Sequence, residues 1–77
     1  MNAPESIRVD ARGLNCPLPI LRAKKALAEL KSGATLEILA TDPGSPGDLQ
    51  AFCRQTGHQL LASRLQDGVY RFLLRKR

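Results

Sequence analysis

The chain has 77 residues, enough for one domain with a small core and too few for a large internal cofactor cavity. Hydrophobic residues make up 43% and charged residues 25%, a balance that excludes a wholly disordered chain. The net charge of +5 favours an acidic partner, either nucleic acid or the acidic surface of another protein. We expect a single domain over residues 1–77, with residues 1–5 as a frayed tail.

No apolar run approaches the roughly 18 residues that a membrane-spanning helix needs, and the first residues lack the apolar segment of a secretory signal. The sequence therefore predicts a cytoplasmic protein without membrane contact. Cys16 and Cys53 are too few for a disulfide scaffold, and a cytoplasmic chain keeps its thiols reduced. Cys53 fits the usual fate of a free cysteine, which is a small buried hydrophobic residue.

Apolar and polar residues alternate over residues 6–10, which predicts a short first strand followed by a loop over 11–15. Apolar residues spaced by three and four then predict a helix over residues 17–31, ended by Gly33. The residues expected on its buried face are Ile20, Ala23, Leu27 and Leu30.

Pro17 and Pro19 are compatible with this helix if they lie in its first turn. The first four amides of a helix have no intrahelical acceptor, so a missing N–H costs little there. The two prolines therefore determine where the helix begins.

A second strand is predicted over residues 35–41, followed by a turn cluster over 42–46. Ser45 is expected as the N-cap of a second helix, with Pro46 at its first position and Asp48 at its third. The second helix should end near Thr56, because Gly57 follows.

Two further strands are predicted over residues 58–65 and 69–75, joined by a hairpin turn over 66–68. The element order is strand, helix, strand, helix, strand, strand. Alternation in the strands predicts a four-stranded mixed sheet with one buried face. Both helices should cover that face, which gives a two-layer α/β sandwich.

Cys16 is the residue that we expect to carry chemistry. It precedes Pro17, so it lies at the N-cap of the first helix or one position outside it. The positive end of the helix dipole and unpaired first-turn amides stabilise a thiolate there. Arg12 and Arg22 could add positive charge. The sequence therefore predicts an exposed, nucleophilic thiol with a lowered pKa.

Few reaction types suit this thiol. The one histidine, His58, is not placed near it by the sequence, and no second cysteine lies at C-x-x-C spacing for a dithiol cycle. Two dispersed cysteines and one histidine are a poor zinc set, so we expect no metal and no cofactor. A lone exposed thiolate is best suited to accept a group by attack and pass it on.

The sequence D-A-R-G-L-N-C-P-L-P over residues 10–19 resembles the D-x-x-G-x-x-C-P-x-P signature of the TusA/SirA family of sulfur carriers. The similarity extends over roughly residues 6–75, through the Asp42-Pro43 and Phe52-Cys53 pairs. The resemblance implies a βαβαββ sandwich similar to the C-terminal domain of bacterial translation initiation factor 3. It also implies that Cys16 carries a persulfide.

The resemblance further implies a sulfurtransferase component that works by persulfide relay. A cysteine desulfurase or rhodanese-like protein would donate sulfane sulfur, and an acceptor sulfurtransferase would receive it. The pathway would be tRNA thiolation, molybdenum-cofactor maturation or sulfur oxidation. We expect a monomer that makes no direct contact with nucleic acid.

The other motif residues have supporting parts in this hypothesis. Gly13 should supply a bend in the loop, and Asp10 either orients that loop or is an ordinary acid at a strand end. Leu18 is expected to be exposed and to contact a partner, and Arg22 to steer it.

Two other functions stay open at this point. The net charge is also compatible with an RNA-binding module, although only three aromatic residues are available for base stacking. Alternatively, Cys16 could act as a redox sensor in a regulatory domain.

Overall fold

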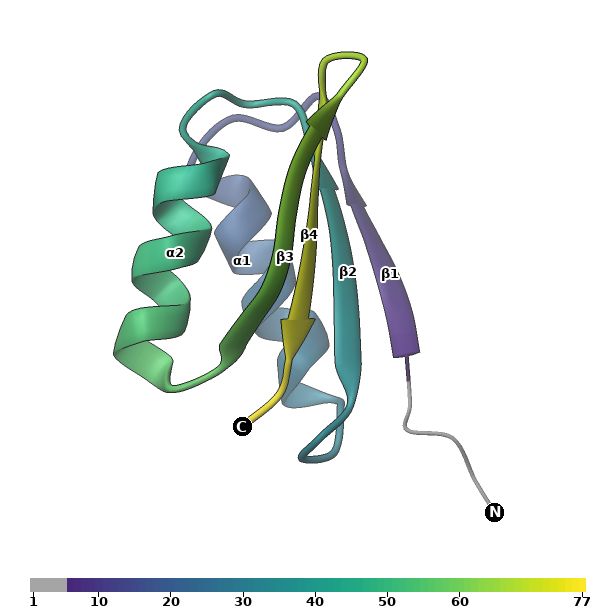
Figure 1. Ribbon diagram of the computed structural model, residues 1–77, viewed down its shortest axis with the longest axis vertical. Helices are drawn as coiled ribbons and strands as arrows, with labels where there is room; N and C mark the ends of the chain where they lie inside the picture. The colour runs from purple at the N-terminus through teal and green to yellow at the C-terminus, as the bar shows by residue number, and fades with distance from the viewer. Residues whose placement is uncertain (1–5) are drawn as a thin grey trace.

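The computed structural model describes residues 6–77 and contains the predicted elements in the predicted order (Figure 1). The frayed tail expected over residues 1–5 lies outside the described residues. The elements are β1 (Ser6–Ala11), α1 (Leu18–Ala28), β2 (Thr35–Ala40), α2 (Ser45–Thr56), β3 (Gln59–Gln66) and β4 (Val69–Arg75).

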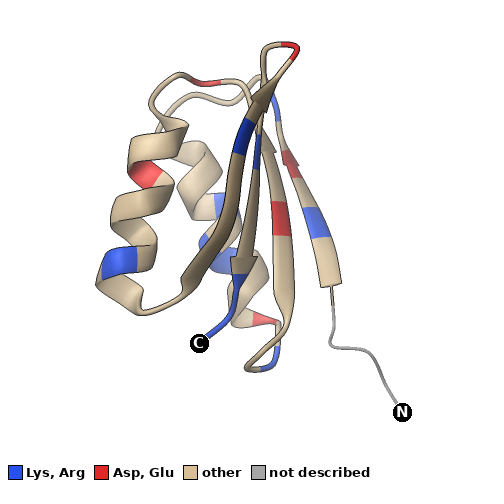
Figure 2. Ribbon diagram, in the orientation of Figure 1, with Lys and Arg blue, Asp and Glu red and all other residues tan. Residues whose placement is uncertain are grey.

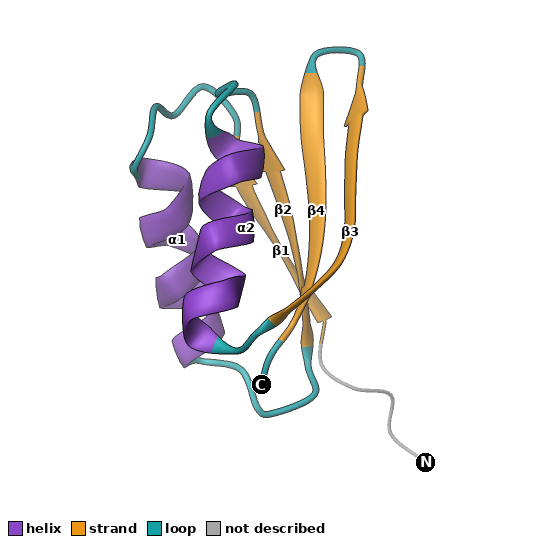
Figure 3. Ribbon diagram, turned by 60° about the vertical axis from the view of Figure 1, so that its left-hand side comes forward, coloured by secondary structure: helices purple, strands orange, loops and turns teal. Residues whose placement is uncertain are grey.

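The four strands form one sheet in the order β1-β2-β4-β3. β1 and β2 are parallel, whereas β4 is antiparallel to both of its neighbours, so the sheet is mixed as predicted. Both helices lie against the same face of this sheet (Figure 3). The predicted two-layer α/β sandwich is therefore confirmed.

The core lies between the helices and the sheet, and it is richest beneath the two central strands. Alternate residues of β2 and β4 point toward the helices, as the period of two in a strand requires. Edge strands β1 and β3 contribute little to it. The buried core residues are Ala11, Ala23, Leu27, Leu30, Ala34, Leu36, Ile38, Ala40, Leu49, Phe52, Cys53, Phe72 and Leu74.

The first helix is shorter than predicted, because it begins at Leu18 and ends at Ala28. Its last carbonyls are taken by tighter bonds and by a distant side chain. The Leu30 amide donates to the Leu27 carbonyl, and the Lys76 ammonium donates to the carbonyls of both residues. Gly33, with a φ of +86°, lies in the turn before β2 and does not end the helix.

The prediction that Ser45 caps the second helix is wrong. Gly44 is the N-cap and Ser45 is the first helical residue, with only 1% of its surface exposed. The turn before the helix is organised by Asp42, whose carboxylate accepts the Gly44 amide and whose carbonyl accepts the Ser45 amide. The Asp48 amide, which a Ser45 cap could have bound, donates instead to the Gly44 carbonyl.

The other end of α2 follows the prediction. Gly57 adopts a φ of +86° and its amide donates to the Cys53 carbonyl, a left-handed termination that suits glycine. β3 begins one residue later than predicted, at Gln59. Asp67 and Gly68 both have positive φ between β3 and β4, which is the conformation of a tight two-residue hairpin.

Candidate functional site

Cys16 lies in the loop that joins β1 to α1, one position outside the helix. Pro17 is the N-cap, Pro19 lies in the first turn, and the Cys16 side chain is exposed. The Leu18 amide donates to the Asn15 carbonyl, so it is not directed at the sulfur. The predicted position and exposure are confirmed, but the expected hydrogen bonds from first-turn amides to the sulfur are not found.

The loop that carries Cys16 is held at two points. The Asp10 carboxylate accepts the Arg12 amide and forms an ion pair with the Arg12 guanidinium at 2.8 Å. These bonds lower the pKa of Asp10 to about 2. Gly13, with a φ of +79°, donates its amide to the Thr41 hydroxyl at the end of β2. Asp10 therefore orients the loop, and Gly13 supplies the expected bend.

The sulfur of Cys16 has an acidic partner on the second helix. Its thiol donates a hydrogen bond to Asp48 Oδ2 over 2.8 Å. The two residues meet because β1 and β2 are parallel, so the helix that follows each strand begins at the same end of the sheet. Figure 2 shows the acidic position near the start of α2, at that same end.

The predicted low pKa of Cys16 is wrong. The hydrogen bond to Asp48 raises the pKa of the Cys16 thiol above its ordinary value, and desolvation and the negative charges of Asp48 and Asp42 act in the same direction. A neighbouring carboxylate disfavours the thiolate, because like charges repel and the hydrogen bond to Asp48 needs the proton of the thiol. The contact with Asp48 therefore favours the thiol form of Cys16 over the thiolate.

Neither of the two arginines expected near the sulfur reaches it. Arg12 is paired with Asp10, and Arg22 lines a shallow depression between β1 and the outer side of α1, together with Arg8 and Lys25. The charges that act on the thiol come from carboxylates instead. Arg22 is exposed on α1.

A groove between the two helices opens beside Cys16. It has a volume of about 290 Å³ and is lined by residues of both helices. They include Pro17 at the N-cap of α1, Ile20 and Lys24 on α1, and Asp48 and Phe52 on α2. Lys24 supplies the positive charge in this groove, one helical turn beyond Ile20.

Leu18 is exposed to 45% of its surface and Leu21 to 50%. Both lie in the first turns of α1, next to the loop that carries Cys16. The exposure expected of Leu18 is confirmed. Together the two leucines give this end of the molecule an apolar surface near the thiol.

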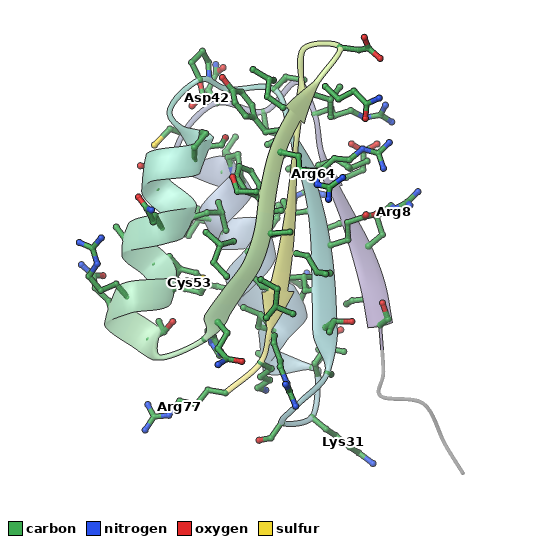
Figure 4. All side chains as sticks on the ribbon, viewed as in Figure 1. Arg8, Lys31, Asp42, Cys53, Arg64 and Arg77 are labelled. Carbon is green, nitrogen blue, oxygen red and sulfur yellow. The ribbon has the colours of Figure 1, made fainter. Side chains whose placement is uncertain are left out.

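His58 lies at the far end of the helix layer from Cys16. It follows α2, whose twelve residues span about 18 Å. Its Nδ1 accepts the Arg77 amide at 3.0 Å, and its ring packs against Phe52. Figure 4 shows Arg77 at this end and Asp42 at the opposite one. His58 is therefore placed to hold the C-terminus and not to act on the Cys16 thiol.

Cys53 is buried between α2 and the sheet, as predicted (Figure 4). Burial raises the pKa of its thiol. The two cysteines therefore do not meet: one is a core residue and the other is exposed at the start of the helix layer.

Two residues of the site were not identified from the sequence. Asp48 was assigned to the first turn of α2 and noted among the positions that resemble the family, without a role at the sulfur, and Thr41 was assigned only to a strand end. The sequence does contain a signal for Asp48. Two strand-helix units in succession place both helix starts at one end of the sheet, so first-turn residues of the two helices become neighbours.

The fold and site define a small α/β sandwich with an exposed, proline-flanked cysteine where a loop meets a helix. A family profile described as "Sulfurtransferase TusA" matches residues 7–76. The chain belongs to the TusA family of sulfur carriers, and the resemblance found in the sequence is confirmed.

Individual relatives support this membership. The sulfur carrier protein TusA of Allochromatium vinosum is 54% identical over 68 residues, which cover 88% of this chain and 90% of that protein. A protein of Neisseria meningitidis serogroup A, provisionally named a sulfur carrier, is 64% identical over 62 residues, or 80% and 84% of the two chains.

A solved structure shows the same fold. The crystal structure of the SirA-like protein from Desulfitobacterium hafniense superimposes with a TM-score of 0.80 and 36% sequence identity, covering 88% of this chain and 93% of that one. Within residues 6–77, neither helix is long and apolar enough to cross a membrane.

Proposed function

We propose that Cys16 accepts sulfane sulfur as a persulfide and passes it to an acceptor protein. The observation that carries this proposal is the exposed Cys16 thiol at the start of α1, within the C-P-x-P sequence and next to an open groove. Family membership supports sulfur carriage as the general activity. The roles of individual residues and the direction of transfer belong to the proposal.

The chemistry requires only one sulfur atom of this chain. Cys16 Sγ attacks the outer sulfur of a donor Cys–S–SH, a new S–S bond forms, and the donor S–S bond breaks. The donor leaves as a thiol, and Cys16 becomes Cys16–S–SH. A second attack, by an acceptor thiol on the outer sulfur of Cys16, then completes the relay. No net oxidation occurs, and the step uses no metal or other cofactor.

The surface around Cys16 suits entry into the active site of a partner. The thiol lies at one end of the molecule, Leu18 and Leu21 offer apolar contact, and Arg22 is exposed nearby on α1. The net charge of +5 favours acidic partners. A cysteine desulfurase or a rhodanese-like protein in the cytoplasm is the proposed donor, and an acceptor sulfurtransferase is the proposed recipient.

The same surface argues against an RNA-binding module. Phe72 is buried, and Tyr70 stacks on it with ring centroids 6.2 Å apart, on the side of the sheet that the helices cover. Phe52 is buried as well. The aromatic rings therefore do not form a platform on which bases could stack.

The proposed function is tested by loading the protein with sulfur. Incubation with a cysteine desulfurase and cysteine should add the mass of one sulfur atom to the intact wild-type protein. Cys16→Ser should abolish this addition, while Cys53→Ala, which leaves the exposed thiol in place, should retain it. Wild-type protein that gains no sulfur from a competent donor would refute the proposal.

A further inference from the structure

The carboxylate of Asp48 lies directly beside the Cys16 sulfur. Its Oδ2 lies 2.8 Å from Cys16 Sγ and accepts the thiol proton in a hydrogen bond. We propose that Asp48 is a catalytic residue that takes the proton from Cys16 as the sulfur attacks a donor persulfide. This inference rests on the proposed function of Cys16 and adds a proton acceptor to it.

The need for an acceptor follows from the resting state of the site. Thiolates attack S–S bonds and thiols do not, so the proton must leave the sulfur before or during attack. The charged groups that act on Cys16 Sγ are the carboxylates of Asp48 on α2 and Asp42 on the preceding loop, and Lys24 lines the same groove from α1. His58, the usual base in such sites, lies at the other end of α2.

Asp48 is the one of these carboxylates that is positioned to receive the proton. Asp42 Oδ2 is occupied by the Gly44 amide. Asp10, near the end of β1, is paired with Arg12. Within residues 6–77, Asp48 forms no ion pair, and its side-chain hydrogen bond is the one to the thiol.

The step balances without any further reactant. As the bond between Cys16 Sγ and the outer donor sulfur forms, the thiol proton moves to Asp48 Oδ2. The donor S–S bond breaks, and its electron pair leaves with the donor cysteine sulfur. Asp48 then releases the proton, directly or through solvent, to that departing thiolate. The products are Cys16–S–SH and the donor thiol, and the Asp48 carboxylate is restored.

Asp48 has two effects on the thiol, and they oppose each other. Its negative charge disfavours the free thiolate, which slows any reaction that needs a thiolate formed beforehand. Its carboxylate accepts the proton during attack, which speeds a reaction in which attack and proton transfer occur together. Asp48→Asn removes both effects and keeps the size of the side chain and an oxygen that can accept the hydrogen bond.

The experiment measures two reactions of one sulfur in a Cys53→Ala background. Alkylation by iodoacetamide reports how much thiolate is present, and single-turnover sulfur uptake from glutathione persulfide reports the transfer step without a docking partner. In Asp48→Asn we expect faster alkylation below the pKa of the thiol. Sulfur uptake in the same pH range should fall by roughly 100-fold, since positioned bases contribute on the order of 10²-fold or more.

Asp42→Asn is the matched control, because it removes a nearby negative charge that forms no hydrogen bond with Sγ. It should speed alkylation without slowing sulfur uptake. Asp48→Glu should recover part of the uptake lost in Asp48→Asn, and circular dichroism should show all variants folded.

The outcomes separate the two proposals. Uptake as fast in Asp48→Asn as in the wild type, or faster, would overturn the role of Asp48 and leave the carrier function intact. No uptake by the wild type from either donor would overturn both. If Asp42→Asn slowed sulfur uptake as much as Asp48→Asn does, the effect of Asp48 would be one of charge alone. That result would also overturn its role as the proton acceptor.

Discussion

The two cysteines place the same chemical group in two contrasting regions of one small fold. Cys16 is exposed where a loop meets α1, and Cys53 is buried between α2 and the sheet. The thiol pKa is raised in both, at Cys16 chiefly by the hydrogen bond to Asp48 and at Cys53 by burial. Access to the sulfur, rather than ionisation in the resting state, therefore distinguishes the reactive site from the core.

The causes also differ in how they can be changed. The pKa of Cys16 depends chiefly on Asp48, a side chain that a point mutation can alter, whereas that of Cys53 depends on burial in the core. Accordingly, a substitution can change the Cys16 thiol pKa without unfolding the domain. A reagent reaches the Cys53 thiol only when the core opens.

The largest expected difference is in rates of alkylation. In native protein at neutral pH, iodoacetamide should modify Cys16 at least about 10³-fold faster than Cys53, because Cys53 reacts only after an opening that costs several kcal/mol. Peptide mass mapping over time measures both rates. In denaturant the two rates should converge, and equal rates in native protein would show that Cys53 is not in a tight core.

Core packing around Cys53 is tested by Leu49→Ala. Leu49 is fully buried one helical turn before Cys53, so its truncation should lower the free energy of unfolding by about 2–5 kcal/mol. Urea denaturation measures this loss. Leu21→Ala, on the exposed side of α1, is the control and should change stability by less than about 0.5 kcal/mol. Equal effects of the two substitutions would contradict the assigned core.

Stability at alkaline pH should report the burial of Cys53. The Cys53 pKa is raised in the folded state, so its contribution to stability is complete below the ordinary thiol pKa of about 8.5 and is lost as pH rises through the folded-state pKa. Across that window the slope from one thiol is at most about 1.4 kcal/mol per pH unit. Chemical denaturation between neutral and alkaline pH should show a flatter decline in Cys53→Ala than in wild type. An unchanged decline would contradict the assignment to Cys53.

The smallest expected effects concern the two ends of α2. Gly57 has a φ of +86° and its amide bonds to the Cys53 carbonyl, so Gly57→Ala should cost about 1–2 kcal/mol. Gly47, next to Asp48, has open space where a Cβ would lie and a helical backbone, so Gly47→Ala should stabilise by about 0.5 kcal/mol. Thermal unfolding measures both. Destabilisation by Gly47→Ala would show that the start of α2 is more crowded than described.

The elements that the sequence predicted well are those governed by local rules. Strand alternation, the glycine after Thr56 and the turn at Asp67-Gly68 depend on neighbouring residues, and each was found within a residue of its predicted place. The end of α1 was predicted three residues too late, because Lys76, far away in the chain, binds its last carbonyls. Ser45 was misassigned because Asp42 organises the turn before the helix.

The features of the candidate site also divide into those set by neighbouring residues, which were predicted, and those set by distant residues, which were not. The position of Cys16, its exposure and the bend at Gly13 follow from the residues around them and were predicted. The direction of the thiol pKa was wrong, since it depends on a carboxylate 32 positions away in the chain. Arg12 was expected near the sulfur for its closeness in sequence, but its guanidinium is held by Asp10.

The sequence by itself determined the order of the elements, the family and the one cysteine placed at a helix start, because periodicity, turn residues and prolines act over a few neighbouring positions. Only the tertiary structure decided which charges surround that cysteine. Parallel β1 and β2 bring the starts of both helices to one end of the sheet, and this places Asp48 against the sulfur. Electrostatic fields act through space, so they follow the folded arrangement of charges and not their order along the chain.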